Sequence, residues 1–204
     1  MHTILPSPLK LATLPAVLDL IEELIGPDIL LYNVSYIVKE AGTTYYVSWH
    51  QDSNYWGLTL PQASEESGCV RMIPESHVHG RQVYDFTEDK TNVILQGQTV
   101  KDVGEDKAVM CSLEPCEASF HHGWTLHCSL PNKSKDRRIG LNALHLAAHV
   151  SQTKHYIDFA MLIRGRDLYN HFMQDMPAEM VLKPAAVARQ VELETSYIKI
   201  ARTW

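Results

Sequence analysis

The sequence lacks any apolar run long enough to cross a membrane. The stretch from residue 14 to residue 25 is interrupted by Asp19, Glu22 and Glu23, whereas a membrane-spanning helix needs about 20 consecutive apolar residues. The start of the chain also lacks a charged segment followed by an apolar core, which is the pattern of a secretory signal peptide. We therefore predict a cytoplasmic protein that has no membrane partner.

Concentrated positive charge is lacking as well. The formal net charge is -6, the pI is about 6.0, and no run of lysine and arginine stands out. Because nucleic-acid-binding proteins usually carry a basic patch, we predict no nucleic-acid partner. Cysteine is scarce too, and the four cysteines among 204 residues are compatible with reduced thiols in the cytoplasm.

The sequence gives little support to a structural zinc site. Cys111 and Cys116 are followed by His121 and His122. This spacing fits common zinc sites poorly, and a second Cys/His pair in register is missing. A zinc-stabilised, cupin-like binding module is therefore a minor alternative.

The length suits one domain with a substantial core, and no repeat, low-complexity segment or linker divides the chain. We predict a single domain over residues 1–204. Short strands separated by polar turns predict a mainly β, α+β fold of the jelly-roll type with flanking helices. From Pro184 onward we expect a closing helix or an arm. The expected later strands lie near residues 45–49, 69–73, 108–113, 118–122, 124–127 and 138–150.

The first elements can be predicted in more detail. Pro15 fits the first turn of a helix that Thr13 can cap and that ends at residues 26–27, which are Gly-Pro. Residues 29–38 alternate in the manner of a strand. Residues 39–42 then read as a turn, so Lys39 fits a turn better than a ligand contact.

Two separated segments carry the candidate chemistry. His50 and Asp52 are two residues apart, so in an extended chain they project to the same side while Gln51 points away. A third ligand, His127, would come from a distant strand. Two imidazoles and one carboxylate on one face of an octahedral ion are the ligand set of non-haem iron oxygenases, and they leave three positions open.

Arg138 follows His127 by eleven residues and adds a planar, permanent cation suited to a carboxylate. With 11 histidines in the chain, a His-x-Asp pair alone is a weak signal that a solvated loop also explains. His127 alone would more often be a hydrogen-bonded strand histidine. The combination indicates a site that holds iron and a keto acid together.

The residues around these positions resemble the phytanoyl-CoA dioxygenase family. One segment resembles the proximal iron motif, the next the turn and strand that follow it, the third the distal motif, and the fourth a segment near the C-terminus of bacterial members. The resemblance runs from about Leu14 to Phe172. The four segments are residues 49–58, 68–77, 121–140 and 160–167.

This resemblance implies a double-stranded β-helix and assigns His50, Asp52 and His127 to Fe(II). It assigns Arg138 to the distal carboxylate of 2-oxoglutarate and makes Ser129 a second donor to that cosubstrate. Related halogenases carry a small residue at the position of Asp52, so a carboxylate there favours hydroxylation.

Four further residues are candidates for the substrate pocket. Tyr55 and Trp56 follow the proximal motif and fit barrel-rim packing equally well. His121 lies six residues before His127 and would face the same way on one strand, and the resemblance leaves His121 and His122 as neighbours of the metal ligands or as pocket residues. Arg164 could meet an anionic substrate or be a solvated arginine before a glycine turn.

The chain departs from the family pattern in two places. Gln62 runs directly into Ala63, where family members usually have an apolar strand, so one barrel strand would be lacking. Glu75 stands where glycine is common, and a positive φ there would strain it. Cys128 beside the distal ligand is a smaller oddity.

The function expected from the sequence is an Fe(II)- and 2-oxoglutarate-dependent dioxygenase. It would use O2 to hydroxylate, or otherwise oxidise, an unactivated C–H bond of a small-molecule substrate, with release of succinate and CO2. The alternative is a catalytically impaired or truncated relative that binds a ligand or partner. No oligomeric state is predicted.

Overall fold

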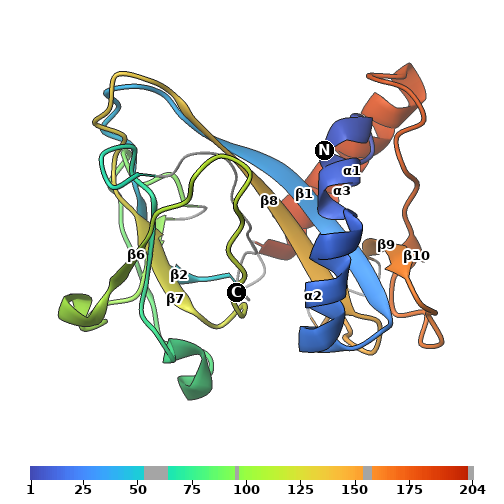
Figure 1. Ribbon diagram of the computed structural model, residues 1–204, viewed down its shortest axis with the longest axis horizontal. Helices are drawn as coiled ribbons and strands as arrows, with labels where there is room; N and C mark the ends of the chain where they lie inside the picture. Colours follow the sequence, from blue (N-terminus) through green and yellow to red (C-terminus); the bar gives the residue numbers. More distant parts are fainter. Residues whose placement is uncertain (53–63, 95–96, 154–157, 202–204) are drawn as a thin grey trace. The chain divides into compact units, whose positions relative to one another are not determined.

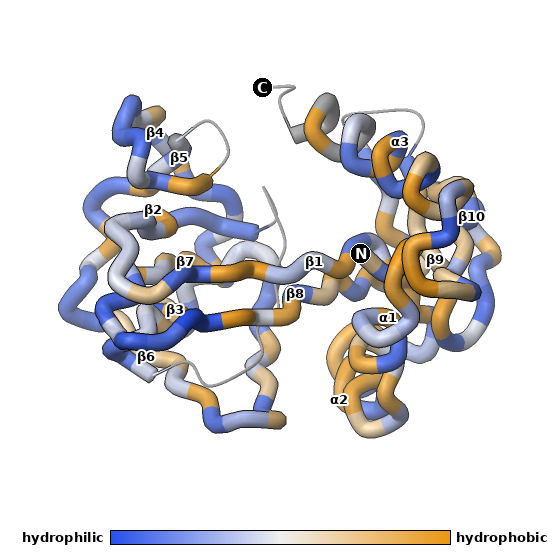
Figure 2. The backbone as a smooth tube through the Cα atoms, turned by 90° about the horizontal axis from the view of Figure 1, so that it is seen from above, coloured by the Kyte–Doolittle hydropathy of each residue, from blue (hydrophilic) through white to orange (hydrophobic). Residues whose placement is uncertain are grey.

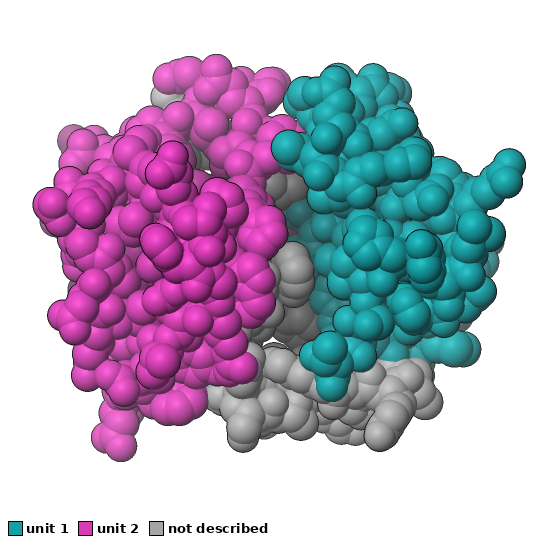
Figure 3. Space-filling model, turned by 90° about the horizontal axis from the view of Figure 1, so that it is seen from below, with its two compact units in different colours: residues 1–35, 143–204 teal, residues 36–142 magenta. Residues whose placement is uncertain are grey.

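The computed structural model describes residues 1–52, 64–94, 97–153 and 158–201. It groups the chain into two compact units, residues 1–35 with 143–204 and residues 36–142 (Figure 3). The chain passes between the units twice, within the strands β1 (Ile29–Lys39) and β8 (Arg138–Ala147). The single domain stays a prediction.

The first unit begins with two helices, α1 (Pro6–Ala12) and α2 (Pro15–Ile25), each of which has proline in its first turn (Figure 1). Proline is well tolerated there because its fixed φ suits the helix and no hydrogen bond is lost. The predicted end of α2 is confirmed, since Gly26 is its C-cap with a φ of 91°. The predicted cap is wrong: Thr13 is the C-cap of α1, and its Oγ1 donates to the Leu9 carbonyl oxygen over 2.8 Å.

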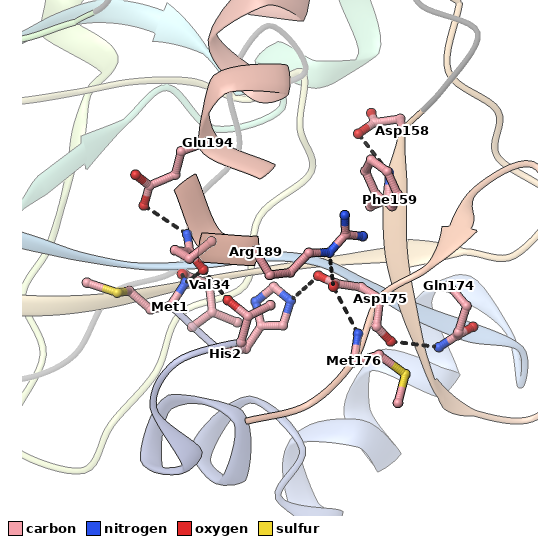
Figure 4. A network of polar contacts seen from close by, with 12 residues as sticks. Met1, His2, Val34, Asp158, Phe159, Gln174, Asp175, Met176, Arg189 and Glu194 are labelled. Atoms are coloured by element: carbon pink, nitrogen blue, oxygen red, sulfur yellow. Dashed lines mark hydrogen bonds and ion pairs between the residues drawn. The ribbon is translucent and has the colours of Figure 1, made fainter. Parts of the chain in front are cut away.

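The helix predicted from Pro184 is confirmed as α3 (Pro184–Ala201). A buried polar network joins this helix to the start of the chain (Figure 4). His2 Nε2 lies 3.0 Å from Asp175 Oδ2, and Arg189 Nε lies 3.7 Å from Asp175 Oδ1. Since Asp175 is only 2% exposed, these partners offset the cost of burying its carboxylate.

The sheet of the first unit has the strand order β10-β9-β1-β8, with β9 over Phe159–Arg164 and β10 over Met173–Gln174. β1 and β9 are antiparallel, and β9 is hydrophobic along most of its length (Figure 2). The first three residues of β1 are all buried, although neighbouring residues of a strand point to opposite faces. This end of the strand is therefore covered on both faces. The alternation expected for β1 is therefore only partial.

The second unit has a four-stranded antiparallel sheet in the order β2-β7-β3-β6. Its core consists of Trp49, Ile73, Val100, Leu126 and Cys128. The elements of this unit are β2 (Val47–Gln51), β3 (Val70–Met72), η1 (Ser76–His79), β4 (Asp85–Phe86), β5 (Gln98–Thr99), η3 (Glu105–Lys107), β6 (Val109–Cys111) and β7 (Leu126–Ser129).

Most of the predicted strands are confirmed, and the structure is mainly β with flanking helices, as expected. One strand prediction is wrong: residues 118–122 form no strand. A turn follows them, in which the Thr125 amide donates to the His122 carbonyl oxygen over 2.8 Å. None of the described helices is long and apolar enough to cross a membrane.

Glu75 has a positive φ, the condition under which we expected strain at this position, with φ 61° and ψ 0°. A left-handed conformation costs a residue with a Cβ about 1–2 kcal/mol. We expect Glu75→Gly to raise the free energy of unfolding by about 1 kcal/mol after the greater chain entropy of glycine is subtracted. Urea unfolding measures this. Glu75→Ala is the control, and an equal gain in that variant would show that the side chain rather than φ is responsible.

Candidate metal centre

The pairing of β2 with β7 brings the two predicted histidine ligands together. His50 and His127 are cross-strand partners, and a bulge between Val47 and His50 shifts the register. Bulges of this kind re-aim side chains next to functional sites. The ring centroids of the two histidines are 4.0 Å apart. Asp52, just beyond β2, completes a group whose ligand atoms all lie within 4.8 Å of one another.

The hydrogen bonds of the two histidines determine which ring nitrogen is available. His50 Nδ1 lies 2.8 Å from the Ser48 carbonyl oxygen, and His127 Nδ1 lies 3.0 Å from the Thr125 carbonyl oxygen. A carbonyl oxygen only accepts, so both Nδ1 atoms carry a proton and donate it. Each Nε2 is then free to act as a ligand, in the arrangement usual for metal-bound histidine.

Three ligand atoms therefore converge inside the protein. His50 Nε2 lies 3.4 Å and His127 Nε2 lies 3.5 Å from Asp52 Oδ1, and all three residues are buried. Three such groups turned toward one point could hold a cation between them, and two imidazoles with one carboxylate suit Fe(II). The residues present therefore fit the metal that the motif implies.

The charge states of the three side chains agree with this arrangement. Burial alone would raise the pKa of Asp52, but the charge of His127 and hydrogen bonds from histidines hold it well below its usual value. Burial would lower the pKa of His127, but Asp52 attracts its proton and raises it. Both shifts arise from the close approach of Asp52 to His127, and a metal ion bound between them would displace any proton on His127 Nε2.

Gln51 points away from this group, as the sequence predicts. Its Nε2 donates to the Gly80 and Trp124 carbonyl oxygens over 2.9 and 2.7 Å. Its Oε1 accepts from the Gln82 amide over 2.7 Å. The fully buried amide thereby ties β2 to the segments on either side of it, and this fixes the strand that carries His50.

Arg138 lies at the start of β8 with its guanidinium buried. Nη1 donates to the Gly68 carbonyl oxygen over 2.6 Å, whereas Nε is buried and has no partner among the described residues. Gly68 has a φ of 71°, and a Cβ there would lie 2.2 Å from the Leu130 carbonyl oxygen. Glycine is therefore required at this position for the close backbone approach beside Arg138.

Lys39 is the residue that the sequence analysis placed wrongly. It is the last residue of β1 rather than part of a turn, and only 5% of it is exposed. Its Nζ donates to the carbonyl oxygens of Ser129 and Leu130. Burial, and then repulsion by Arg138, lowers the pKa of Lys39 to about 7. The alternation of β1 gave no signal for its burial, because Ile37, two residues earlier on the strand, is exposed.

No carboxylate in the described part of the chain lies within 4.0 Å of either buried cation, Lys39 or Arg138. Two buried positive charges without an acidic partner are costly. The arrangement is therefore complementary to an anion. Ser129 is two residues after His127 on β7, so the two side chains lie on the same face of the strand. The carbonyl oxygen of Ser129 in turn contacts Lys39.

The substrate-pocket residues predicted near the two iron motifs are only partly described by the structure. Tyr55, Trp56 and the junction of Gln62 with Ala63 lie outside the described residues. His122 is exposed, with its ring centroid 5.5 Å from that of His77.

Arg164 and the candidate zinc ligands do not belong to the triad. Arg164 belongs to the first unit, where its Nη1 lies 2.8 Å from Asp19 Oδ1 and from Glu22 Oε2. Within the described ranges, the triad is the one group of at least three His, Cys, Asp or Glu side chains that could hold a metal ion. Cys111 and Cys116 take no part in it.

Comparison with known proteins adds independent information. The chain is 26% identical over 164 residues to human peroxisomal phytanoyl-CoA dioxygenase, which covers 73% of this chain and 47% of that protein. It is 26% identical over 185 residues to a probable alpha-ketoglutarate-dependent hypophosphite dioxygenase of Stutzerimonas stutzeri, covering 79% and 62%. The chain thus spans less than two thirds of the length of either relative.

A solved structure agrees closely with the fold. The apo form of ThoJ, described as a non-heme monooxygenase, has a TM-score of 0.84 and 25% identity, covering 98% of this chain and 77% of that one. Residues 7–140 match the sequence profile described as Phytanoyl-CoA dioxygenase (PhyH). The profile spans more than half of the sequence, so the chain belongs to the phytanoyl-CoA dioxygenase family.

Proposed function

We propose that this protein is an Fe(II)- and 2-oxoglutarate-dependent oxygenase. The observation that carries the proposal is the convergence of His50 Nε2, His127 Nε2 and Asp52 Oδ1 in a buried position that could hold a metal ion. Family membership and the names of the relatives support iron and 2-oxoglutarate as the cofactors. We assign the three side chains to the iron.

Arg138 and Lys39 are the groups we assign to the cosubstrate. A dicarboxylate would supply the anion that these two cations lack, and the unpartnered Arg138 Nε could donate to it. Ser129, on the face of β7 that also carries His127, is a further donor. The bound iron and 2-oxoglutarate would supply the oxidising power, with O2 as oxidant and with succinate and CO2 as products.

Within this class we propose hydroxylation of an unactivated C–H bond in a small-molecule substrate. Asp52 supports this reaction because its carboxylate takes the position that a halogenase needs open for a halide. The protein's part is to keep its ligands deprotonated, orient the cosubstrate and exclude water by burying the triad. We further propose that the strands form the double-stranded β-helix expected for the family, with Tyr55 and Trp56 near the substrate.

Anaerobic titration tests the proposal without knowledge of the substrate. Fe(II) with 2-oxoglutarate should give a weak visible charge-transfer band in the intact protein. Addition of air should then release succinate, even without substrate. No band would refute the cosubstrate assignment, and a band without succinate would favour a catalytically impaired relative.

Lys39 should make cosubstrate binding depend on pH. Because its pKa is lowered to about 7, Lys39 loses its charge as pH rises from 6.5 to 9, while the carboxylates of 2-oxoglutarate stay ionised. We expect the affinity for 2-oxoglutarate to fall across this range, by up to about tenfold per pH unit. Calorimetric titration of the Co(II)-loaded protein measures this dependence.

Two variants separate Lys39 from other titrating groups. Lys39→Arg keeps the charge at every pH in this range, so its binding should be strong and nearly independent of pH. Lys39→Met should bind weakly at every pH. If Lys39→Met kept the wild-type pH profile, Lys39 would not be the group responsible.

A further inference from the structure

A third histidine contacts the carboxylate of the triad from its outer side. His121 Nε2 lies 3.3 Å from Asp52 Oδ2, whereas the two predicted histidine ligands approach Oδ1. The side chain of His121 is 8% exposed, and its ring centroid is 4.9 Å from that of His127. The two oxygens of Asp52 therefore have different environments.

The hydrogen bonding of His121 differs in kind from that of the two predicted ligands. Their Nδ1 atoms donate to carbonyl oxygens, which leaves Nε2 as a ligand atom. His121 Nδ1 is buried and has no partner among the described residues. The one acceptor recorded for this ring is Asp52 Oδ2, so the proton of neutral His121 belongs on Nε2. With that proton in place, Nε2 is a hydrogen-bond donor and cannot serve as a metal ligand.

We propose that His121 is a positioning residue that holds Asp52 in coordination through Oδ1 alone. The inference rests on the proposed function, since it concerns the same metal centre. An octahedral ion bound by two imidazoles and one carboxylate oxygen keeps three positions open. A carboxylate that bound through both oxygens would occupy one of them. The Nε2–H of His121 donates a hydrogen bond to Oδ2 and thereby keeps this second oxygen from binding the metal.

The first test does not depend on turnover. In the metal-free protein, long-range proton–nitrogen NMR should find the His121 proton on Nε2 and the His50 proton on Nδ1. A His121 ring with its one proton on Nδ1 and none on Nε2 would overturn the proposal, because Nε2 could then not donate to Asp52.

The second test compares variants loaded with Mn(II), whose effect on water-proton relaxation falls as fewer water molecules bind the ion. His121→Leu removes the donor, so Oδ2 should displace one water and the relaxation should be weaker than in the wild type. His121→Gln can place an amide N–H where Nε2–H lies, so it should restore the wild-type relaxation. His79→Leu, at an exposed histidine of η1, is the control and should change nothing.

Succinate release under air provides the third readout. His121→Leu should lower kcat by about 10- to 100-fold, the usual range for a group that orients a metal ligand, with little change in KM for 2-oxoglutarate. His121→Gln should recover most of the loss. Melting of each metal-free variant reports whether it is folded.

The outcomes separate this proposal from the proposed function. A wild-type protein without a 2-oxoglutarate band would refute the function itself, while the NMR and Mn(II) results would still decide the role of His121. A wild-type band together with unchanged Mn(II) relaxation in His121→Leu would overturn the positioning role alone. Loss of Mn(II) binding in both His121→Leu and His121→Gln would identify His121 as a ligand and would also overturn the proposal.

Discussion

His127→Ala is expected to abolish the Fe(II)–2-oxoglutarate band and succinate release. The substitution removes one of three ligand atoms and leaves a buried carboxylate, Asp52, with one imidazole fewer to balance it. Replacing groups that only orient a metal ligand already costs about 10- to 100-fold in affinity or activity. The loss of a ligand itself should therefore exceed about 100-fold in metal affinity. Competition with a coloured chelator measures this affinity.

The control for this experiment is His122→Ala, which removes an exposed histidine five residues away on the same segment. It should bind metal like the wild type. Thermal melting of metal-free His127→Ala shows whether the variant is folded. A folded His127→Ala protein with unchanged Fe(II) affinity would remove His127 from the metal centre.

Arg138→Met should weaken 2-oxoglutarate binding by roughly 30-fold or more and leave Fe(II) binding nearly unchanged. Truncating one partner of a buried, hydrogen-bonded charge pair costs about 2–5 kcal/mol. Arg138 is 4% exposed and has an unpartnered Nε, so a bound carboxylate would be such a partner. Titration of the Co(II)-loaded protein with 2-oxoglutarate measures the change.

Two arginine variants sharpen this result. Arg138→Lys keeps the charge but not the two-pronged geometry, so it should recover only part of the affinity. Arg137→Ala is the matched control, because Arg137 is exposed and its Nη2 lies 2.9 Å from Glu40 Oε1. Equal losses at both positions would point to a general electrostatic effect rather than a carboxylate contact.

Two of the three triad residues could be predicted from local geometry alone. His50 and Asp52 are two residues apart at the end of a strand, and the period of an extended chain brings them to one side. The resemblance to a family then selected His127 among 11 histidines. No spacing rule alone could have placed it opposite His50, because strand pairing joins distant segments.

The contacts of Lys39 and His121 could not be predicted from the sequence, although His121 was a candidate neighbour of the metal ligands. Lys39 follows a regular strand pattern and precedes a turn, and its role depends on how far β1 continues toward the carbonyl oxygens after β7. His121 was expected on a strand, where it would point the same way as His127. It lies instead on a segment without regular structure, which Gln51 holds by its contact with the Trp124 carbonyl oxygen.

The helix boundaries also show that packing, which the sequence does not display, decides where short elements begin and end. Thr13 is a good N-cap residue in isolation, yet here it ends one helix rather than starting the next. The sequence around Pro15 predicted the second helix but gave no sign of α1, whose seven residues contain two prolines. Short elements of this kind are stabilised by packing rather than by local preference.

A crystal structure of the anaerobic protein with Mn(II) and 2-oxoglutarate would test the central claim most directly. Anomalous scattering locates the metal without reference to the assumed ligands. We predict one strong peak bonded to His50 Nε2, His127 Nε2 and Asp52 Oδ1. A metal bound elsewhere, or absent from these three atoms in protein saturated with Mn(II), would contradict the account.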